Sequence, residues 1–180
     1  MLPIRMIIAG LAAALTLAAQ QVPRKALELS VSFVDGKSVA VSQYRGKPLV
    51  VAFILTGCPH CQHTVGLLSQ LEPRYRPRGV EMLAVAVNRD ASASIPDFVQ
   101  TYHPAFPVGF LRDNGQAADF CQLAPTKIPH MPILVFIDRD GTIRQQHEGS
   151  EPFFEDGNQE QHLAAAIEEL LKPTGTKAAR

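Results

Sequence analysis

Stretches of alternating apolar and polar residues, and stretches that are apolar throughout, predict the strands of this chain. From Ala26 to Val34 the two kinds of residue alternate, which is the period of a half-buried strand. The run from Leu49 to Leu55 is continuously apolar, which is typical of a central strand covered on both faces. Further strands are expected at 38–41, 80–87, 106–111, 133–137 and 142–147, with turns at 35–37 and 138–141.

Apolar residues at helical spacing predict helices between these strands. Pro59 suits a first helical turn, and the apolar residues after it repeat at helical spacing as far as Tyr75. Pro73 is expected to kink or end this helix, because proline has no N–H to donate. Ser92 or Ser94 is expected to cap a second helix. Other helical segments are predicted at 116–123 and 159–171.

The order of these elements predicts a single mixed α/β domain over residues 26–172. A chain of 180 residues is long enough to bury one ordinary core. No internal repeat is present, and no linker divides the chain in two. Residues 173–180 follow the last helix and are expected to form a disordered tail.

The first residues have the pattern of an export signal. Arg5 supplies the positive charge, the stretch from Ile7 to Ala19 is mostly apolar, and small residues at its end suit a cleavage site. This stretch is shorter than the roughly 20 residues of a membrane-spanning helix, which favours a cleaved signal peptide at 1–19 over an N-terminal anchor. We therefore expect a periplasmic or otherwise extracytoplasmic protein, in a compartment where disulfides form.

The net charge and the number of cysteines exclude some classes of function. Lysine plus arginine and aspartate plus glutamate both number 17, so the formal charge is zero and no basic surface suggests a nucleic-acid partner. Three cysteines are too few for a disulfide scaffold. The chain is expected to act as a monomer and without a cofactor.

The most informative motif is the run CPHC at 58–61. Two cysteines separated by two residues at a helix start can close a disulfide, since one turn keeps their Cα atoms within roughly 4.4–6.8 Å. Cys58 falls at the expected N-cap, where unpaired N–H groups and the helix dipole favour a thiolate. It is the candidate attacking thiol, and Cys61, one turn further and more buried, is the candidate resolving thiol. Pro59 stiffens the loop, and His60 adds a donor or a positive charge that also favours the thiolate.

Two other uses of this motif remain open. A permanent disulfide is possible, although a bridge over so short a loop adds little stability by chain entropy. A metal site is the second alternative, but His63 lies about 200° around the helix from Cys61, and no second CxxC completes a zinc site. Redox exchange is the preferred interpretation, with no metal assigned.

Over most of its mature length the chain resembles the extracytoplasmic thioredoxin-like proteins of the TlpA/ResA type. The resemblance lies in GKPLVVAF at 46–53, CPHC at 58–61, Met131-Pro132, ILVFIDRDG at 133–141 and HEG at 147–149. It implies a thioredoxin-like fold, with a central mixed β-sheet flanked by helices, an N-terminal hairpin and a central insertion at about 88–127.

The resemblance also implies roles for Met131 and Pro132. Pro132 would be the cis-proline that faces the active disulfide, and Met131 would offer its backbone to an extended substrate segment. The chain departs from the family at Thr56-Gly57, where the family usually has tryptophan before the first cysteine. Ala52 and Thr64 stand near positions where related proteins place a carboxylate.

We expect a protein-disulfide oxidoreductase that acts on exported cysteine-containing proteins, such as apocytochromes or copper-site proteins. A redox partner would reload the cysteine pair, and the direction of exchange stays open because the Pro-His dipeptide resembles that of oxidising DsbA-type proteins. The alternatives are a copper metallochaperone using Cys58, Cys61 and His130 or Met131, and a thiol peroxidase. The peroxidase is disfavoured because Leu55 replaces the usual threonine three residues before the reactive cysteine. Cys121 is expected to pack as a small apolar residue.

Overall fold

The computed structural model describes residues 22–155 and 157–173. The signal peptide predicted at 1–19, and all but the first residue of the tail predicted at 173–180, lie outside these ranges. Within them, no helix combines the length and the apolar character that a membrane crossing requires.

The described strands form one mixed sheet in the order β1-β8-β7-β4-β5-β6-β2-β3. Strands β4, β5 and β6 run parallel to one another, whereas β7 is antiparallel to both β4 and β8. The strands are β1 (Arg24–Lys25), β2 (Ser30–Ser32), β3 (Ser38–Ala40), β4 (Leu49–Ile54), β5 (Glu81–Ala86), β6 (Val108–Phe110), β7 (Ile133–Ile137) and β8 (Thr142–Glu148). The predicted mixed sheet and the hairpins β2–β3 and β7–β8 are confirmed.

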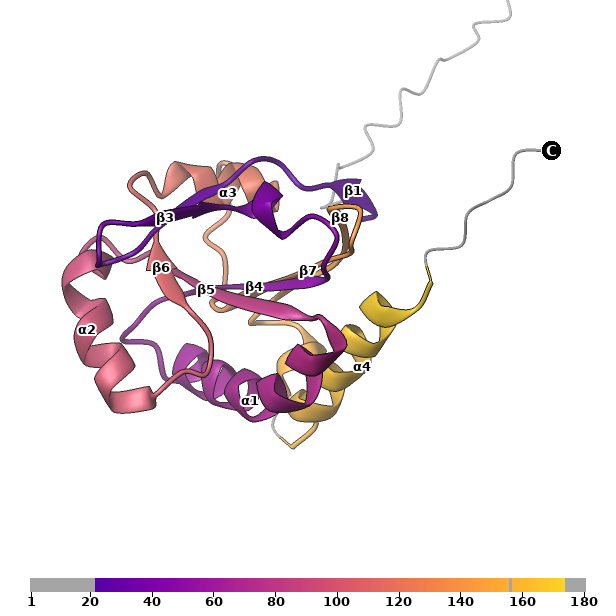
Figure 1. Ribbon diagram of the computed structural model, residues 1–180. Coiled ribbons are helices and arrows are strands. Elements are labelled where there is room, and N and C mark those ends of the chain that lie inside the picture. Colours follow the sequence, from indigo (N-terminus) through magenta and orange to yellow (C-terminus); the bar gives the residue numbers. More distant parts are fainter. Residues whose placement is uncertain (1–21, 156, 174–180) are drawn as a thin grey trace, which may run out of the picture.

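Helices cover the sheet on both faces, as Figure 1 shows. Helices α1 (Pro59–Tyr75) and α4 (Gln159–Leu171) lie on one face, and α2 (Ala91–Tyr102) stands at the β6 end. The short helix α3 (Gly115–Cys121) lies on the opposite face (Figure 1). Short 3-10 turns occur at Val41–Tyr44, Arg76–Arg78 and Pro152–Phe154.

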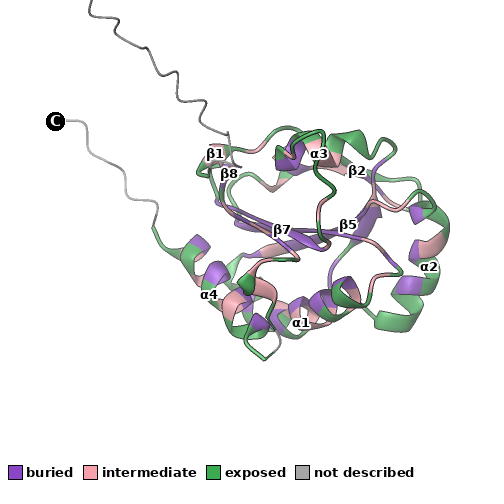
Figure 2. Cartoon of the chain, turned by 180° about the vertical axis from the view of Figure 1, so that it is seen from behind, coloured by how far each residue is buried: buried purple, intermediate pink, exposed green. Residues whose placement is uncertain are grey.

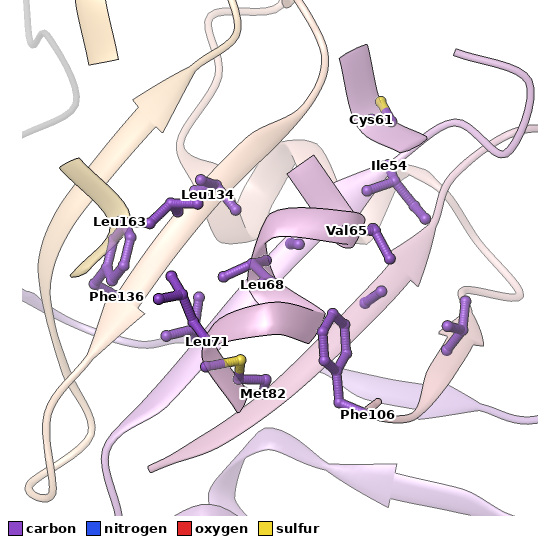
Figure 3. Packing of buried hydrophobic residues seen from close by; sticks show 14 of the residues in the cluster. Ile54, Cys61, Val65, Leu68, Leu71, Met82, Phe106, Leu134, Phe136 and Leu163 are labelled. Carbon is purple, nitrogen blue, oxygen red and sulfur yellow. The ribbon is translucent and has the colours of Figure 1, made fainter. Parts of the chain in front are cut away.

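Two apolar clusters, one on each face, hold these layers together. All six residues of β4 are buried, and alternate side chains of this strand enter opposite clusters. The first cluster joins the sheet to α1, α2 and α4; Figure 3 shows Leu68 of α1, Phe136 of β7 and Leu163 of α4 within it. The second lies under α3 and contains Phe53 and Phe120, whose ring centroids are 5.7 Å apart. Figure 2 shows the same division: the helices are buried towards the sheet and exposed on their outer sides.

The strand predicted from Ala26 to Val34 is confirmed only over Ser30–Ser32, because the chain before these residues passes from one edge of the sheet towards the other. Arg24 and Lys25 pair with β8 at one edge, whereas Ser30–Ser32 pair with β3 and β6 near the opposite edge. Between them the chain lies over the sheet, where Leu29 is buried and Leu27 is 51% exposed. Alternation of apolar and polar residues therefore occurs in a half-buried segment that crosses the sheet, and not only in a strand.

The cap expected for the second helix is also corrected. Helix α2 begins at Ala91 with Asp90 as its N-cap, so Ser92 and Ser94 lie inside the helix. The Ser94 hydroxyl donates to the Asp90 carbonyl, four residues earlier, at 3.1 Å, a bond that serines make inside helices. Helix α1 continues through Pro73 to Tyr75 before it ends.

Candidate active site

The motif CPHC stands where the buried strand β4 passes into helix α1. Cys58 is the N-cap, with the extended backbone angles φ −89° and ψ 120°, and Pro59 occupies the first helical position. The Cys58 N–H donates to the Leu55 carbonyl at 3.1 Å, which closes the loop, and the Cys58 carbonyl accepts the Gln62 N–H at 3.0 Å. The Cys58 side chain is thus placed at the end of the helix where backbone N–H groups have no partner inside the helix.

The two thiols of the motif differ sharply in their access to solvent. Cys58 is partly exposed, whereas Cys61 is completely buried against the first apolar cluster (Figure 3). The Leu55 N–H donates to the Cys61 Sγ at 3.4 Å. Burial raises the pKa of the Cys61 thiol well above its usual range, and the neighbouring Cys58 thiol raises it further. A disulfide from outside can therefore meet Cys58 first.

His60 is exposed on the first turn of α1, and so is His63 one turn further. The His60 side chain thus lies in solvent beside the motif, while its backbone carbonyl accepts the Thr64 hydroxyl at 2.8 Å. Within the described residues, no three His, Cys, Asp or Glu side chains gather in a way that could hold a metal ion.

A side-chain network fixes the loop before Cys58. The Thr56 N–H donates to Asn88 Oδ1 at 3.1 Å, and the Thr56 hydroxyl donates to the Ser94 hydroxyl at 3.0 Å. The Thr56 carbonyl accepts Gln62 Nε2 at 2.9 Å, and Asn88 Nδ2 also donates to Ser94. In this chain, hydrogen bonds from the loop after β5, from α2 and from α1 thus hold the loop at the position where the family usually has tryptophan. Sequence analysis missed Asn88, because nothing local in the sequence brings it to Thr56.

A second polar pair lies behind the motif in the apolar core. Gln159, the first residue of α4, donates through Nε2 to the Thr64 hydroxyl at 2.7 Å, and both side chains are buried. Because Thr64 itself donates to the His60 carbonyl, this pair connects α4 to the first turn of α1. No sequence signal pointed to Gln159, which reads as an ordinary polar residue in the first turn of an amphipathic helix.

The Met131–Pro132 segment lies directly before β7. Its peptide bond is cis, and Met131 packs against both apolar clusters, the first of which Cys58 also contacts. The neighbouring backbone is held by the Gly149 N–H, which donates to the His130 carbonyl at 2.9 Å. Within the described residues, neither the N–H nor the C=O of Met131 has a hydrogen-bond partner. This backbone is therefore available to an extended segment.

Replacing Gly149 with alanine is expected to displace the Met131 backbone. A Cβ atom at Gly149 would stand 2.6 Å from the Met131 carbonyl oxygen, which is closer than such atoms approach in proteins. We expect the free energy of unfolding to fall by about 1–3 kcal/mol, as for other over-packed sites, and thiol–disulfide exchange with a peptide to slow. Urea unfolding and a peptide-exchange assay measure the two effects.

Gly66→Ala provides the matched control. Gly66 lies inside α1, and a Cβ atom there meets no other atom within 4 Å. Alanine is expected to stabilise this helix by about 0.5–1 kcal/mol and to leave exchange unchanged. Equal effects of the two substitutions would show that the contact at Met131 has no special importance.

Cys121 is completely buried at the end of α3, away from the motif. Burial raises its pKa to about 12; Arg24 nearby acts to lower this pKa and Glu148 acts to raise it. Cys121 packs against the second apolar cluster, on the opposite face of the sheet from Cys61.

The buried thiols predict that the reduced protein loses stability at alkaline pH. In the unfolded chain a thiol ionises near pH 8.5, whereas folded Cys61 and Cys121 stay protonated to higher pH. Above about pH 8.5 the folded state therefore binds more protons than the unfolded state, and the free energy of unfolding falls as the pH rises. Cys121→Ala should make this decline shallower by up to about 1.4 kcal/mol per pH unit. Urea unfolding of both proteins at several pH values measures the slopes, and identical slopes would contradict the expectation.

Comparison with known proteins identifies the family. Residues 20–146 match the model of the AhpC/TSA family. The thiol-disulfide oxidoreductase ResA of Bacillus thuringiensis subsp. konkukian is 24% identical over 131 residues, covering 73% of this chain and 72% of the relative. ResA of Halalkalibacterium halodurans is 29% identical over 154 residues, covering 83% of this chain and 78% of the relative.

Solved structures agree with this assignment at the level of the fold. A thiol:disulfide interchange protein of the thioredoxin family from Chlorobium tepidum superposes with a TM-score of 0.68 at 21% identity, covering 86% of this chain and 100% of that structure. The fold is therefore thioredoxin-like, as the sequence predicted. With paired thiols at the end of its central strand and ResA proteins among its relatives, the protein is a thiol–disulfide oxidoreductase, and the chain belongs to the AhpC/TSA family.

Proposed function

We propose that the protein exchanges disulfides with exported cysteine-containing proteins, using Cys58 as the attacking thiol and Cys61 as the resolving thiol. The observation that carries this assignment is the unequal burial of the two thiols. Cys58 is partly exposed at the N-terminus of α1, and Cys61 is buried one turn behind it. Only the first can meet a sulfur atom of another protein without a rearrangement of the core.

The exchange proceeds in two displacements. The Cys58 thiolate attacks one sulfur of a substrate disulfide, forms a mixed disulfide and releases the other substrate sulfur as a thiolate, which takes up a proton. Cys61 then loses its proton and attacks the Cys58 sulfur, which expels the second substrate thiol. The substrate gains two electrons and two protons, and the protein is left with a Cys58–Cys61 disulfide. The same steps in reverse oxidise a dithiol substrate.

Residues around the motif support these steps. Cys58 is the N-cap, so its side chain lies at the end of α1 where the first backbone N–H groups have no partner inside the helix. The hydrogen bonds at Thr56 hold the preceding loop in one arrangement. The backbone N–H and C=O of Met131 have no hydrogen-bond partner in the described part of the chain. We propose that they pair with an extended substrate segment, with the cis-proline Pro132 beside it. Pro59 and His60 would tune the thiolate from the first turn of α1.

The first residues of the chain and the chemistry of disulfide exchange support a proposed location and proposed partners for the protein. The pattern at 1–19 favours export, so we propose a periplasmic or otherwise extracytoplasmic site of action, with an anchored form as the alternative. Apocytochromes and copper-site proteins are candidate substrates, since both present cysteine pairs that must be kept reduced before their ligands bind. A separate redox partner would restore the working state of Cys58 and Cys61.

A single-turnover reaction tests this function. Reduced protein is mixed with a disulfide-bonded peptide, the thiols are alkylated at intervals, and the products are weighed by mass spectrometry. We expect reduced peptide and Cys58–Cys61 disulfide to appear in equal amounts, faster than with glutathione at the same thiol concentration. Peptide reduction without formation of this disulfide would contradict the proposal.

A further inference from the structure

An apolar groove of about 290 Å³ opens beside Met131, on the face of the sheet that α3 covers. Phe53 of β4 and Ile133 of β7 form its floor, where they are paired in register. Ala117 and Ala118 of α3 also line the groove, with small side chains that leave it open. The segment between α3 and β7, which includes Leu123, contributes further lining residues.

The same segment presents apolar surface to solvent. Ile128 lies within it and is 89% exposed, the highest value among the large apolar residues that are exposed in the described part of the chain. Lys127, at the rim of the groove, is paired with Glu148 at 2.7 Å, so its charge is already compensated. Exposed apolar surface around a concave apolar groove is typical of a site that binds another molecule.

The position of the groove relative to Cys58 restricts what can occupy it. Cys58 packs against the apolar cluster on the α1 face, whereas Phe53 and Ile133 belong to the cluster on the α3 face. Met131 contacts both clusters, so its backbone lies at the boundary between the two faces. Successive side chains of an extended segment paired with Met131 would point to opposite faces. When the reactive cysteine points towards Cys58, the residue next to it points towards the groove.

We propose that this groove binds a bulky apolar side chain immediately adjacent to the reactive cysteine of the substrate protein. The inference rests on the proposed exchange function and adds a substrate preference to it: sites with leucine, isoleucine, methionine or phenylalanine beside the cysteine react fastest. Burial of one such side chain corresponds to a rate advantage of roughly 10- to 100-fold over a polar residue of similar size.

Three short peptides test the preference on the reduced wild-type protein. Each carries one cysteine in a disulfide with an aromatic thiol, whose release is followed by absorbance as Cys58 attacks the peptide sulfur. One peptide has leucine next to the cysteine, one has glutamine there, and one has leucine two residues away. We expect the first to react roughly 10- to 100-fold faster than the other two, which should react alike.

Substitutions in the groove provide the second arm of the test. Ala118→Glu places a charged side chain on the wall of the groove and is expected to slow only the peptide with adjacent leucine, to the rate of the glutamine peptide. Ala93→Glu, at an exposed position of α2, should keep the full preference. Ala93→Glu should also react with the aromatic disulfide alone at the wild-type rate.

The outcomes separate the two proposals. If the wild-type protein reacted with all three peptides at equal rates, the proposed role of the groove would be overturned and the exchange function would stand. Faster reaction of the peptide with leucine two residues away would also overturn it, because that side chain lies on the cysteine's own face. Absence of any reaction with the peptides would instead contradict the proposed function itself. The wild-type comparison decides the matter even where a variant does not fold.

Discussion

Replacing Cys58 with serine is expected to reduce thiol–disulfide exchange to the background rate, whereas replacing Cys61 with serine is expected to trap the mixed disulfide. The thiolate is the nucleophile in exchange, and a serine hydroxyl does not take its place. In Cys61→Ser the exposed Cys58 still attacks the substrate, but the thiol that resolves the intermediate is missing. Non-reducing electrophoresis and mass spectrometry of the quenched reaction detect the covalent complex.

Cys121→Ser is the control for these two substitutions. Cys121 is buried on the opposite face of the sheet, so its loss should leave both the rate and the products of exchange unchanged. Accumulation of a mixed disulfide in Cys58→Ser, but not in Cys61→Ser, would reverse the assigned roles. A mixed disulfide on Cys121 would show that the third thiol takes part.

Replacing Phe136 with alanine is expected to have the largest effect on stability, about 3–5 kcal/mol. Phe136 lies in the middle of β7, is completely buried and packs between the sheet and α4 (Figure 3). Its ring also lies 6.0 Å from that of Phe153 and 6.1 Å from that of His147. Removal of this side chain loses its burial and leaves a cavity among neighbours that are fixed by the sheet. Urea unfolding of the reduced proteins measures the change.

Val99→Ala is the matched control for the core. Val99 lies in α2 and is 39% exposed, so its truncation should change the free energy of unfolding by less than about 0.5 kcal/mol. A loss at Phe136 no greater than the loss at Val99 would mean that β7 is not the packed centre of the domain.

The elements that the sequence predicted best are those with one unambiguous pattern. Strand β7 and helix α4 have the bounds that were expected. A continuous apolar run defines β7, and apolar residues repeated at helical spacing define α4, so each pattern is contained in the element itself. The strand predicted from Ala26 to Val34 is shorter than expected, because alternation does not show which strand a segment pairs with. Arg24 and Lys25, just before this segment, pair at one edge of the sheet, whereas Ser30–Ser32 pair near the other edge. No local sequence pattern contains this tertiary arrangement.

The candidate site divides in the same way. The placement of Cys58 and Cys61 at a helix start was predicted from the sequence, because four consecutive residues define it locally. Asn88 and Gln159 were not found, since each comes from another part of the chain and bonds to a neighbour of the motif, Asn88 to Thr56 and Gln159 to Thr64. The groove beside Met131 could not be predicted from the sequence either, because residues from separate parts of the chain form it.

The central claim is that Cys58 and Cys61 form a redox pair rather than a structural bridge. The most direct test is the equilibrium potential of the pair in a series of glutathione buffers, read by alkylation and mass spectrometry. We predict one two-electron transition between about −270 mV, a value like that of thioredoxin, and about −120 mV, a value like that of DsbA. A pair that stays oxidised to below about −300 mV, as structural disulfides do, would contradict the claim.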